Sequence, residues 1–275
     1  MVTPPGPEKK VNPVVLVAAQ EAGVDEIYRV GGAQAIAALA YGTATIPKVD
    51  VITGPGNIYV ALAKKMVYGT VGIDSIAGPS EVLIIADSAA NPKHVAADLL
   101  AQAEHDPMAA AILITTDSAL ARQVVTEVNA QLADHPRRID TEKAIAHYGL
   151  VIIVDSLERA VALSNEFAPE HLELEIESPW DLLEHVRHAG AIFLGYSTPE
   201  AVGDYIAGPN HTLPTSGAAR YASALGVETF MKHSSIIQYS PAALGLVSES
   251  IDRLATAEGL PSHAASVRMR TQDAS

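Results

Sequence analysis

Short apolar runs rich in β-branched residues alternate along this chain with segments of helical length. We expect strands at residues 26–30, 49–52, 81–86, 110–115, 150–154, 172–176 and 191–194. When strands alternate with helices, each connection crosses over the sheet, so the strands run parallel and helices cover both faces. The pattern therefore predicts an α/β fold with a mostly parallel sheet.

A polar residue followed by proline indicates several helix starts. The polar side chain accepts from free N–H groups of the first turn, and proline at the first helical position gives up a donor that has no partner there. We expect helices to begin at Asn12-Pro13, Asn91-Pro92, Ser178-Pro179, Thr198-Pro199 and Ser240-Pro241.

The pattern divides the chain into three sections. Residues 1–80 are punctuated by glycine, and residues 81–225 alternate regularly between strand and helix. Residues 226–275 look helical and polar. This last section is too thin to bury a core alone, so we expect it to pack on another lobe or on a second subunit.

Composition excludes several classes of protein. With 48% hydrophobic residues the chain can bury a core, and its net charge of −14 opposes binding to nucleic acid or anionic lipid. The absence of cysteine excludes disulfides, thiolate nucleophiles and thiolate zinc sites. No apolar run approaches the roughly 18 residues of a membrane helix. We therefore expect a cytoplasmic protein that binds neither nucleic acid nor membranes.

Glycine-containing turns recur in the first section. Gly54-Pro55-Gly56-Asn57 follows an expected strand and opens an expected helix, where free N–H groups attract an anion. It lacks the third glycine of a dinucleotide fingerprint, so a plain tight turn is an equal alternative. Gly31-Gly32-Ala33-Gln34 and Gly78-Pro79-Ser80-Glu81 repeat the arrangement. These turns either line a crevice at strand ends or serve only as turns.

Gln102 and His105 lie three residues apart near the end of the helix that begins at Pro92. Side chains at this spacing share one helix face and can grip one metal ion. The alternative is an ordinary solvated face, because His185 and His188 have the same spacing within a charged stretch.

Glu170 and His171 follow Ala168-Pro169, where proline ends a helix and a strand begins. A carboxylate beside an imidazole at a sheet edge can form an acid/base pair, because both titrate or can be tuned near neutrality. A surface turn would have the same sequence.

A long polar loop, residues 203–215, contains Asp204 and His211 without an evident strand or helix. Long ordered loops in compact domains often carry function. Together with Glu258 and His263 near the C-terminus, these residues provide oxygen and nitrogen donors suited to Zn²⁺ or another divalent ion.

Ordered motifs across the whole chain closely resemble histidinol dehydrogenase. The motifs are Gly-Gly-Ala-Gln-Ala-Ile-Ala-Ala-Leu-Ala (31–40), Gly-Pro-Gly-Asn (54–57), Ala-Gly-Pro-Ser-Glu-Val (77–82), Gln-Ala-Glu-His (102–105), Ala-Pro-Glu-His-Leu (168–172), the Gly-Asp-Tyr and Gly-Pro-Asn-His segments within 203–215, and Glu-Gly-Leu with His263 (258–263). The resemblance implies oxidation of L-histidinol to L-histidine, in histidine biosynthesis, with two NAD⁺ in succession and a bound zinc ion.

The resemblance also implies roles for individual residues. His171 would be the general base, and Glu170 would activate the water that adds to the bound aldehyde. The implied zinc ligands are Gln102, His105, Asp204 and His263, which anchor the substrate as well. Further substrate contacts are implied for Ser80, His211 and Glu258, and nucleotide contacts for Gln34 and Asn57.

The resemblance further implies a homodimer with sites shared between chains, in which Glu258 and His263 complete the partner's site. It covers about the last two-thirds of a family member, so we expect incomplete Rossmann-like lobes with an unpaired sheet edge. The implied parts are a partial nucleotide-binding lobe (1–80), a partial catalytic Rossmann-like lobe (81–225) and a helical C-terminal dimerisation segment (226–275). Two alternatives remain open. One is a catalytically silent fragment that keeps metal or partner binding, and the other is a relative that oxidises a different small polar alcohol.

Overall fold

The structure is a computed structural model that describes residues 1–6, 8–76 and 78–272. It divides into two compact units, Met1–Phe230 and Met231–Ser275. None of the helices in the described ranges is long and apolar enough to cross a membrane.

The centre of the first unit is a five-stranded sheet whose pairings are all parallel, with the order β5-β4-β3-β6-β7. The strands are β3 (Glu81–Ala86), β4 (Ala110–Thr115), β5 (Gly149–Ile153), β6 (His171–Glu175) and β7 (Ala191–Leu194). The α/β fold with parallel sheets and helical C-terminal segment is thus confirmed. β5 forms one edge, and its Leu150 and Ile153 are about half exposed.

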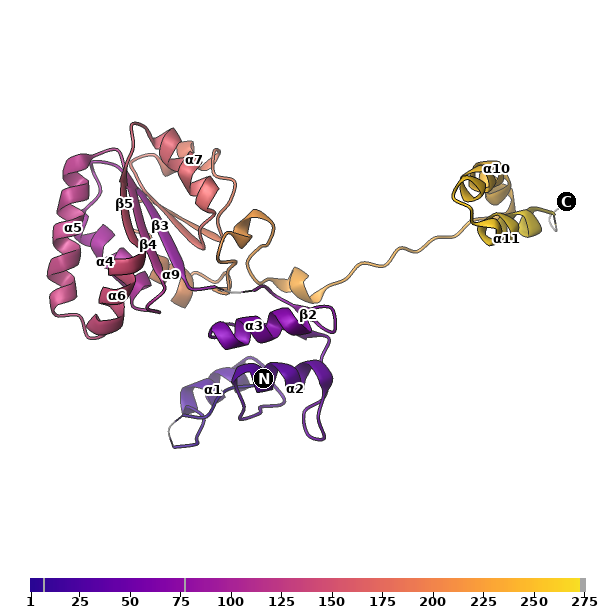
Figure 1. Ribbon diagram of the computed structural model, residues 1–275, viewed down its shortest axis with the longest axis horizontal. Helices are drawn as coiled ribbons and strands as arrows, with labels where there is room; N and C mark the ends of the chain where they lie inside the picture. The colour runs from indigo at the N-terminus through magenta and orange to yellow at the C-terminus, as the bar shows by residue number, and fades with distance from the viewer. Residues whose placement is uncertain (7, 77, 273–275) are drawn as a thin grey trace. The chain divides into compact units, whose positions relative to one another are not determined.

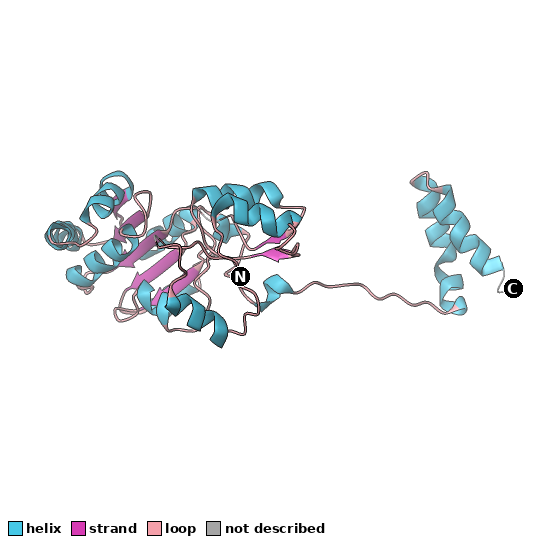
Figure 2. Cartoon of the chain, turned by 90° about the horizontal axis from the view of Figure 1, so that it is seen from below, coloured by secondary structure: helices cyan, strands magenta, loops and turns pink. Residues whose placement is uncertain are grey.

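Helices cover both faces of this sheet (Figures 1 and 2). On one face, Val82 and Ile84 pack with residues of α4 (Pro92–Ala103) and α5 (Ser118–Ala133), and α6 (Arg138–Tyr148) lies against α4 and β4. On the other face, Leu83 and Ile85 pack with residues of α7 (Leu157–Phe167) and α8 (Pro179–Leu183). Alternate residues of β3 therefore contribute side chains to two separate hydrophobic cores, one on each face of the sheet.

The N-terminal part of this unit contains three helices and a two-stranded parallel sheet. Its elements are α1 (Pro13–Glu21), α2 (Gly32–Tyr41), β1 (Val51–Ile52), α3 (Ile58–Val67) and β2 (Gly72–Ile73). The strand expected at residues 26–30 is wrong, because only Tyr28 there forms an isolated bridge, with Val2. Gly78-Pro79-Ser80 leads into strand β3 rather than into a helix, which corrects the expected turn arrangement.

The expected helix starts hold, but two of the capping arguments do not. Asn12, Asn91 and Ser240 accept from the first turns of their helices. Ser178 makes no capping bond, and the cap of α9 (Glu200–Tyr205) is Pro199 itself, because the Thr198 hydroxyl donates to Leu194 O.

The second unit is a pair of helices, α10 (Pro241–Ala257) and α11 (Pro261–Gln272), in contact with each other. Gly259, with φ of 71°, makes the turn between them. Ala255 and Ala264 are buried, whereas large apolar side chains such as Leu246 and Leu254 are exposed. This helical pair leaves much of its apolar surface uncovered. The division of residues 1–225 into two lobes stays a prediction.

Candidate functional site

The first unit has a cavity of about 410 Å³ beside the amino ends of β3 and β6. Ligands of parallel α/β sheets more often bind at the carboxyl ends of strands. Here the α4 C-terminus, helix α9 and the loop that follows α9 supply the polar groups. The lining residues that bear on function are Ser80, Gln102, His105, Glu170, His171, Glu200, Asp204 and His211.

His171 is the first residue of β6 and is almost fully buried. Its Nδ1 lies 3.0 Å from the carbonyl oxygen of Glu81. A carbonyl oxygen only accepts, so this contact favours the tautomer with the proton on Nδ1. Nε2 then carries the lone pair, and it is buried without a hydrogen-bond partner among the described residues. Burial lowers the pKa of His171 to about 4, which keeps the ring neutral near pH 7.

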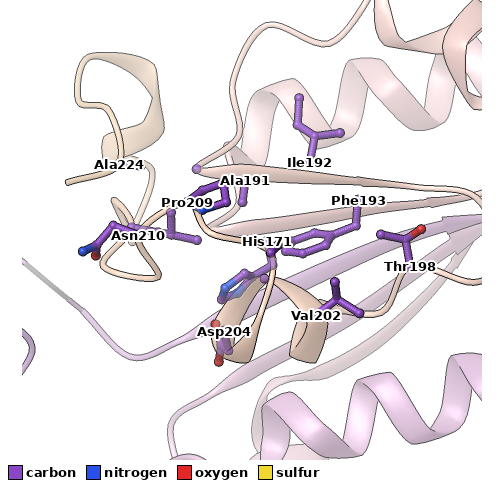
Figure 3. A pocket seen from close by; sticks show the side chains of 14 residues that line it. His171, Ala191, Ile192, Phe193, Thr198, Val202, Asp204, Pro209, Asn210 and Ala224 are labelled. Atoms are coloured by element: carbon purple, nitrogen blue, oxygen red, sulfur yellow. The ribbon is translucent and has the colours of Figure 1, made fainter. Parts of the chain in front are cut away.

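A second pocket, of about 340 Å³, shares His171 and Asp204 with the first (Figure 3). The His171 ring and the Asp204 carboxylate lie on the same side of this pocket in Figure 3. Phe193 of β7 flanks the imidazole, with the ring centroids 6.0 Å apart. The apolar flank desolvates the imidazole, which is the main cause of its low pKa.

Glu170 precedes His171 and is buried as well, which argues against the surface-turn alternative. Its Oε2 accepts from the backbone N–H of Glu81 at 3.0 Å and lies 3.8 Å from His171 Nδ1. Burial raises the pKa of Glu170 to about 8, and the nearby Glu200 adds to that rise. A carboxyl group with this pKa can both take and give a proton near neutrality.

Gln102 ends the last turn of α4 and is fully buried. Its side-chain amide lies against His171 Nδ1, Glu200 Oε2 and Glu81 O. With the proton on Nδ1, the amide oxygen of Gln102 accepts from Nδ1 at 3.0 Å, which supports the same tautomer. His105 lies just beyond the helix end, so the two residues do not share a helix face, but both line the cavity.

The donor atoms of His105, Glu200 and Asp204 lie within 4.8 Å of one another. Asp204 belongs to the short helix α9 rather than to an irregular loop, which corrects the expected loop boundary. One imidazole nitrogen and two carboxylate oxygens form a donor set suited to zinc. The residues therefore fit a metal ion at this position.

The other expected site residues of the first unit fall into three places. Ser80 and His211 line the main cavity. Asn57 lines an adjoining cavity of about 260 Å³ with Ser80 and His105, and its side chain caps α3 by accepting from Tyr59 and Val60. Gln34 lies exposed on α2, outside the residues that line these cavities.

In the second unit, Glu258 caps the C-terminus of α10 and His263 lies in the first turn of α11. Both are exposed there. Their participation in the site stays a prediction.

Sequence reasoning missed Glu200 and Glu81, two buried acids of the cavity region. Glu200 directly follows the expected helix start Thr198-Pro199, and Glu81 opens an apolar strand. An acid at the first position of a buried strand or helix was the available signal. The expected helical pairing of His185 with His188 is wrong, because α8 ends at Leu183.

Comparison with known proteins identifies the family of the chain. Residues 1–271 match the family model described as histidinol dehydrogenase. The chain is 79% identical over 272 residues to histidinol dehydrogenase 2 of Trichormus variabilis and 77% identical to the histidinol dehydrogenase of Synechococcus sp., covering 99% of this chain and 63% of each relative. The crystal structure of histidinol dehydrogenase from Elizabethkingia anophelis matches with a TM-score of 0.93 and 42% identity over 99% of this chain and 63% of that one. The chain thus spans less than two-thirds of the length of these relatives.

Proposed function

The chain belongs to the histidinol dehydrogenase family, and on this premise we propose that it is a zinc-dependent NAD oxidoreductase acting on L-histidinol. The proposed reaction converts this amino alcohol to L-histidine through the aldehyde, with two hydride transfers to NAD⁺. The observation that carries the proposal is His171, whose unpartnered Nε2 lies at a cavity beside a three-residue metal-donor cluster.

His171 is proposed as the general base of the first oxidation. As the carbinol carbon loses hydride, the hydroxyl oxygen loses its proton to Nε2, and the carbonyl bond forms. The neutral ring that this step needs is supported by the low pKa of His171. The contact between Nδ1 and Glu81 O holds the ring in the tautomer that presents Nε2.

Glu170 is proposed as the base that acts on water between the two oxidations. It takes a proton from the water that adds to the aldehyde carbon, and the carbonyl oxygen is protonated to give the hydrate. The hydrate then loses hydride from carbon and a hydroxyl proton to His171, which yields the carboxylic acid. A pKa near 8 suits a carboxyl group that alternates between these protonation states.

Zinc would be held by Gln102, His105 and Asp204 of one subunit together with His263 of the partner subunit, with Glu200 beside His105 and Asp204. When bound, zinc orients the imidazole and amino nitrogens of the substrate, and NAD⁺ accepts the hydride. Ser80, His211 and Glu258 are proposed to contact the substrate. Gln34 and Asn57 are proposed to contact the nucleotide.

A homodimer with shared sites is proposed for the second unit. Leu246 and Leu254 are exposed on its helices, and Ile236 and Ile237 are exposed in the segment before them. Exposed apolar area of this kind favours contact with another protein surface. In the proposed dimer, Glu258 and His263 complete the site of the partner.

The test is NADH formation from L-histidinol by the purified chain, with and without a metal chelator. NADH that disappears with chelator and returns with Zn²⁺ supports the proposal. Zinc uptake without NADH from any alcohol favours a catalytically silent fragment. This alternative has to be tested because the chain spans only 63% of the length of its relatives. NADH from other small polar alcohols but not from histidinol favours a relative with a different substrate.

A further inference from the structure

Strand β6 carries two more carboxylates beyond the catalytic cavity, on the sheet face that bears His171. Residues two apart on a strand share a face, so Glu173 and Glu175 follow His171 along it. Glu173 pairs in register with Ile84 and Phe193, and Glu175 pairs with Ala86. Both carboxylates therefore lie in the largely apolar layer between the sheet and α4.

Asp98 of α4 faces these two carboxylates across that layer. One carboxylate oxygen of each residue lies within 4.8 Å of those of the other two. Glu173 and Glu175 are only 1% and 4% exposed, whereas Asp98 is half-buried and connects the cluster with solvent. The cluster of Asp98, Glu173 and Glu175 is thus shielded from solvent on the β6 side and accessible to solvent on the α4 side.

The buried oxygens in this cluster lack protein partners. Both carboxylate oxygens of Glu175 and Oε2 of Glu173 have no hydrogen-bond donor among the described residues. The other oxygen of Glu173 accepts from the backbone N–H of Glu200 at 2.7 Å. Across the described part of the chain no ion pair involves any of the three, and the basic group acting on Asp98 is the exposed His94.

Burying these carboxylate oxygens without hydrogen-bond donors is energetically unfavourable. Buried polar groups almost always have partners, and like charges held this close repel one another. Burial raises the pKa of Glu175 to about 8 and that of Asp98 to about 6, which expresses the same cost. The cluster lacks hydrogen-bond donors, and one bound cation would interact favourably with all three carboxylates.

We propose that Asp98, Glu173 and Glu175 bind one hard divalent cation, with Ca²⁺ as the best fit. Ca²⁺ binds oxygen at about 2.3–2.6 Å, so oxygens on opposite sides of the ion stand up to about 5 Å apart, which matches this cluster. An all-carboxylate set prefers hard cations to zinc, whereas the zinc donors at the catalytic cavity include the His105 nitrogen. The two sites therefore differ in chemistry.

The proposed ion would link β6 to α4. His171 is the first residue of β6 and Gln102 is in the last turn of α4, so both elements lead into the catalytic cavity. Binding at the cluster would stabilise the relative placement of these two elements. It does so without touching substrate, so the ion has a structural role.

The experiment is a Ca²⁺ titration of the full chain, first stripped with chelator and then freed of it, with thermal unfolding and calorimetric binding as the readouts. The variants are Asp98→Asn, Glu175→Gln and, as the matched control at the other donor cluster, Asp204→Asn. For the unmodified chain and Asp204→Asn, we expect Tm to rise by about 5 °C at a hundredfold excess of Ca²⁺ over Kd. For Asp98→Asn and Glu175→Gln, the rise and the bound Ca²⁺ should be lost.

Two results would overturn the proposal. One is an unmodified chain whose Tm and calorimetric heat do not respond to Ca²⁺. The other is a Ca²⁺ response that persists in Asp98→Asn but disappears in Asp204→Asn, which would assign the ion to the catalytic donor cluster. Asp98 is half-buried, so Asp98→Asn decides the matter even if Glu175→Gln does not fold.

Discussion

Lys64 and Asp74 form an ion pair in which both side chains are almost fully buried. The pair holds the turn at Gly54 from both sides. Lys64 Nζ donates to the Gly54 carbonyl oxygen at 3.1 Å, and Asp74 Oδ2 accepts from the Gly54 N–H at 2.7 Å. Gly54 has a φ of 120°, a conformation that disfavours other residues. A glycine turn whose sequence alone suggested anion binding is thus built on a buried charge pair.

Replacing Asp74 with Asn should be strongly destabilising. The substitution keeps the shape of the side chain but leaves the Lys64 ammonium buried without its counter-charge. Breaking a buried pair in this way costs about 3–5 kcal/mol. Urea unfolding should show that loss in the free energy of unfolding.

The matched control is the exposed pair Lys143–Asp140, with N–O distance 3.5 Å. Asp140→Asn should change the free energy of unfolding by less than about 1 kcal/mol, because surface pairs contribute little. Equal losses from Asp74→Asn and Asp140→Asn would show that burial of the Lys64–Asp74 pair has no energetic consequence.

The two proposed oxidations should depend differently on pH. The pKa of His171 is lowered to about 4, so its imidazole is already almost entirely neutral at pH 6. Glu170 has its pKa raised to about 8, so the carboxylate needed to activate water increases as the pH rises toward that value. We expect the alcohol step to be flat between about pH 6 and 9 and the aldehyde step to rise across this range.

Single-turnover rates with the alcohol and with the aldehyde as separate substrates measure this difference. Glu170→Gln should remove the pH rise and slow mainly the aldehyde step, whereas His171→Asn should slow both steps by about 10²–10⁴-fold. Unchanged rates in either variant would defeat the assigned roles.

Gly190→Ala should disturb the acid/base pair without changing any charged group. A Cβ at Gly190 would lie 2.6 Å from the backbone oxygen of Glu170, and that oxygen also accepts from Ala191 N at 2.8 Å. The backbone at Glu170 must therefore move, which shifts the carboxyl group from its bond to Glu81. We expect a loss of kcat of at least about tenfold, since small misplacements are costly in catalysis.

Gly245→Ala is the control for that substitution. Gly245 lies in α10 with open space around its Cβ position, so alanine should stabilise the helix by about 0.5–1 kcal/mol. If Gly190→Ala keeps full activity, the close approach to Glu170 does not constrain the site.

The layout of the fold follows from local signals in the sequence. The strands Glu81–Ala86, Ala110–Thr115 and Ala191–Leu194 occur where apolar β-branched runs predict them. The first two runs are buried on both faces in a parallel sheet, which is the setting where pattern and structure agree best, whereas β7 is an edge strand with Ile192 exposed. The segment 26–30 failed because a short apolar run without sheet neighbours forms only a bridge.

The candidate site was only partly predictable. Gln102, His105, Glu170, His171 and Asp204 were found by motif, but the buried acid Glu200 was not. The run Leu172-Glu173-Leu174-Glu175 shows why the burial of an acid is hard to predict from sequence. Its alternation is typical of a strand with one solvated face, yet both glutamates are buried, because α4 covers that face. Sequence period gives the alternation of faces, whereas tertiary packing decides which face meets solvent.

The buried carboxyl of Glu175 should make stability depend on pH in the absence of divalent cations. Its pKa is raised from 4.5 to about 8 in the folded chain, so the folded state binds more protons than the unfolded state between these values. The stabilisation from this group is therefore complete below about pH 4.5 and is lost as the pH rises toward 8, with a slope of at most about 1.4 kcal/mol per pH unit. Glu175→Gln should flatten this decline, while Glu177→Gln, at an exposed carboxyl on the same segment, should leave it in place. Urea unfolding in chelator at several pH values measures the slope, and the same decline in Glu175→Gln as in the unmodified chain would show that another group causes it.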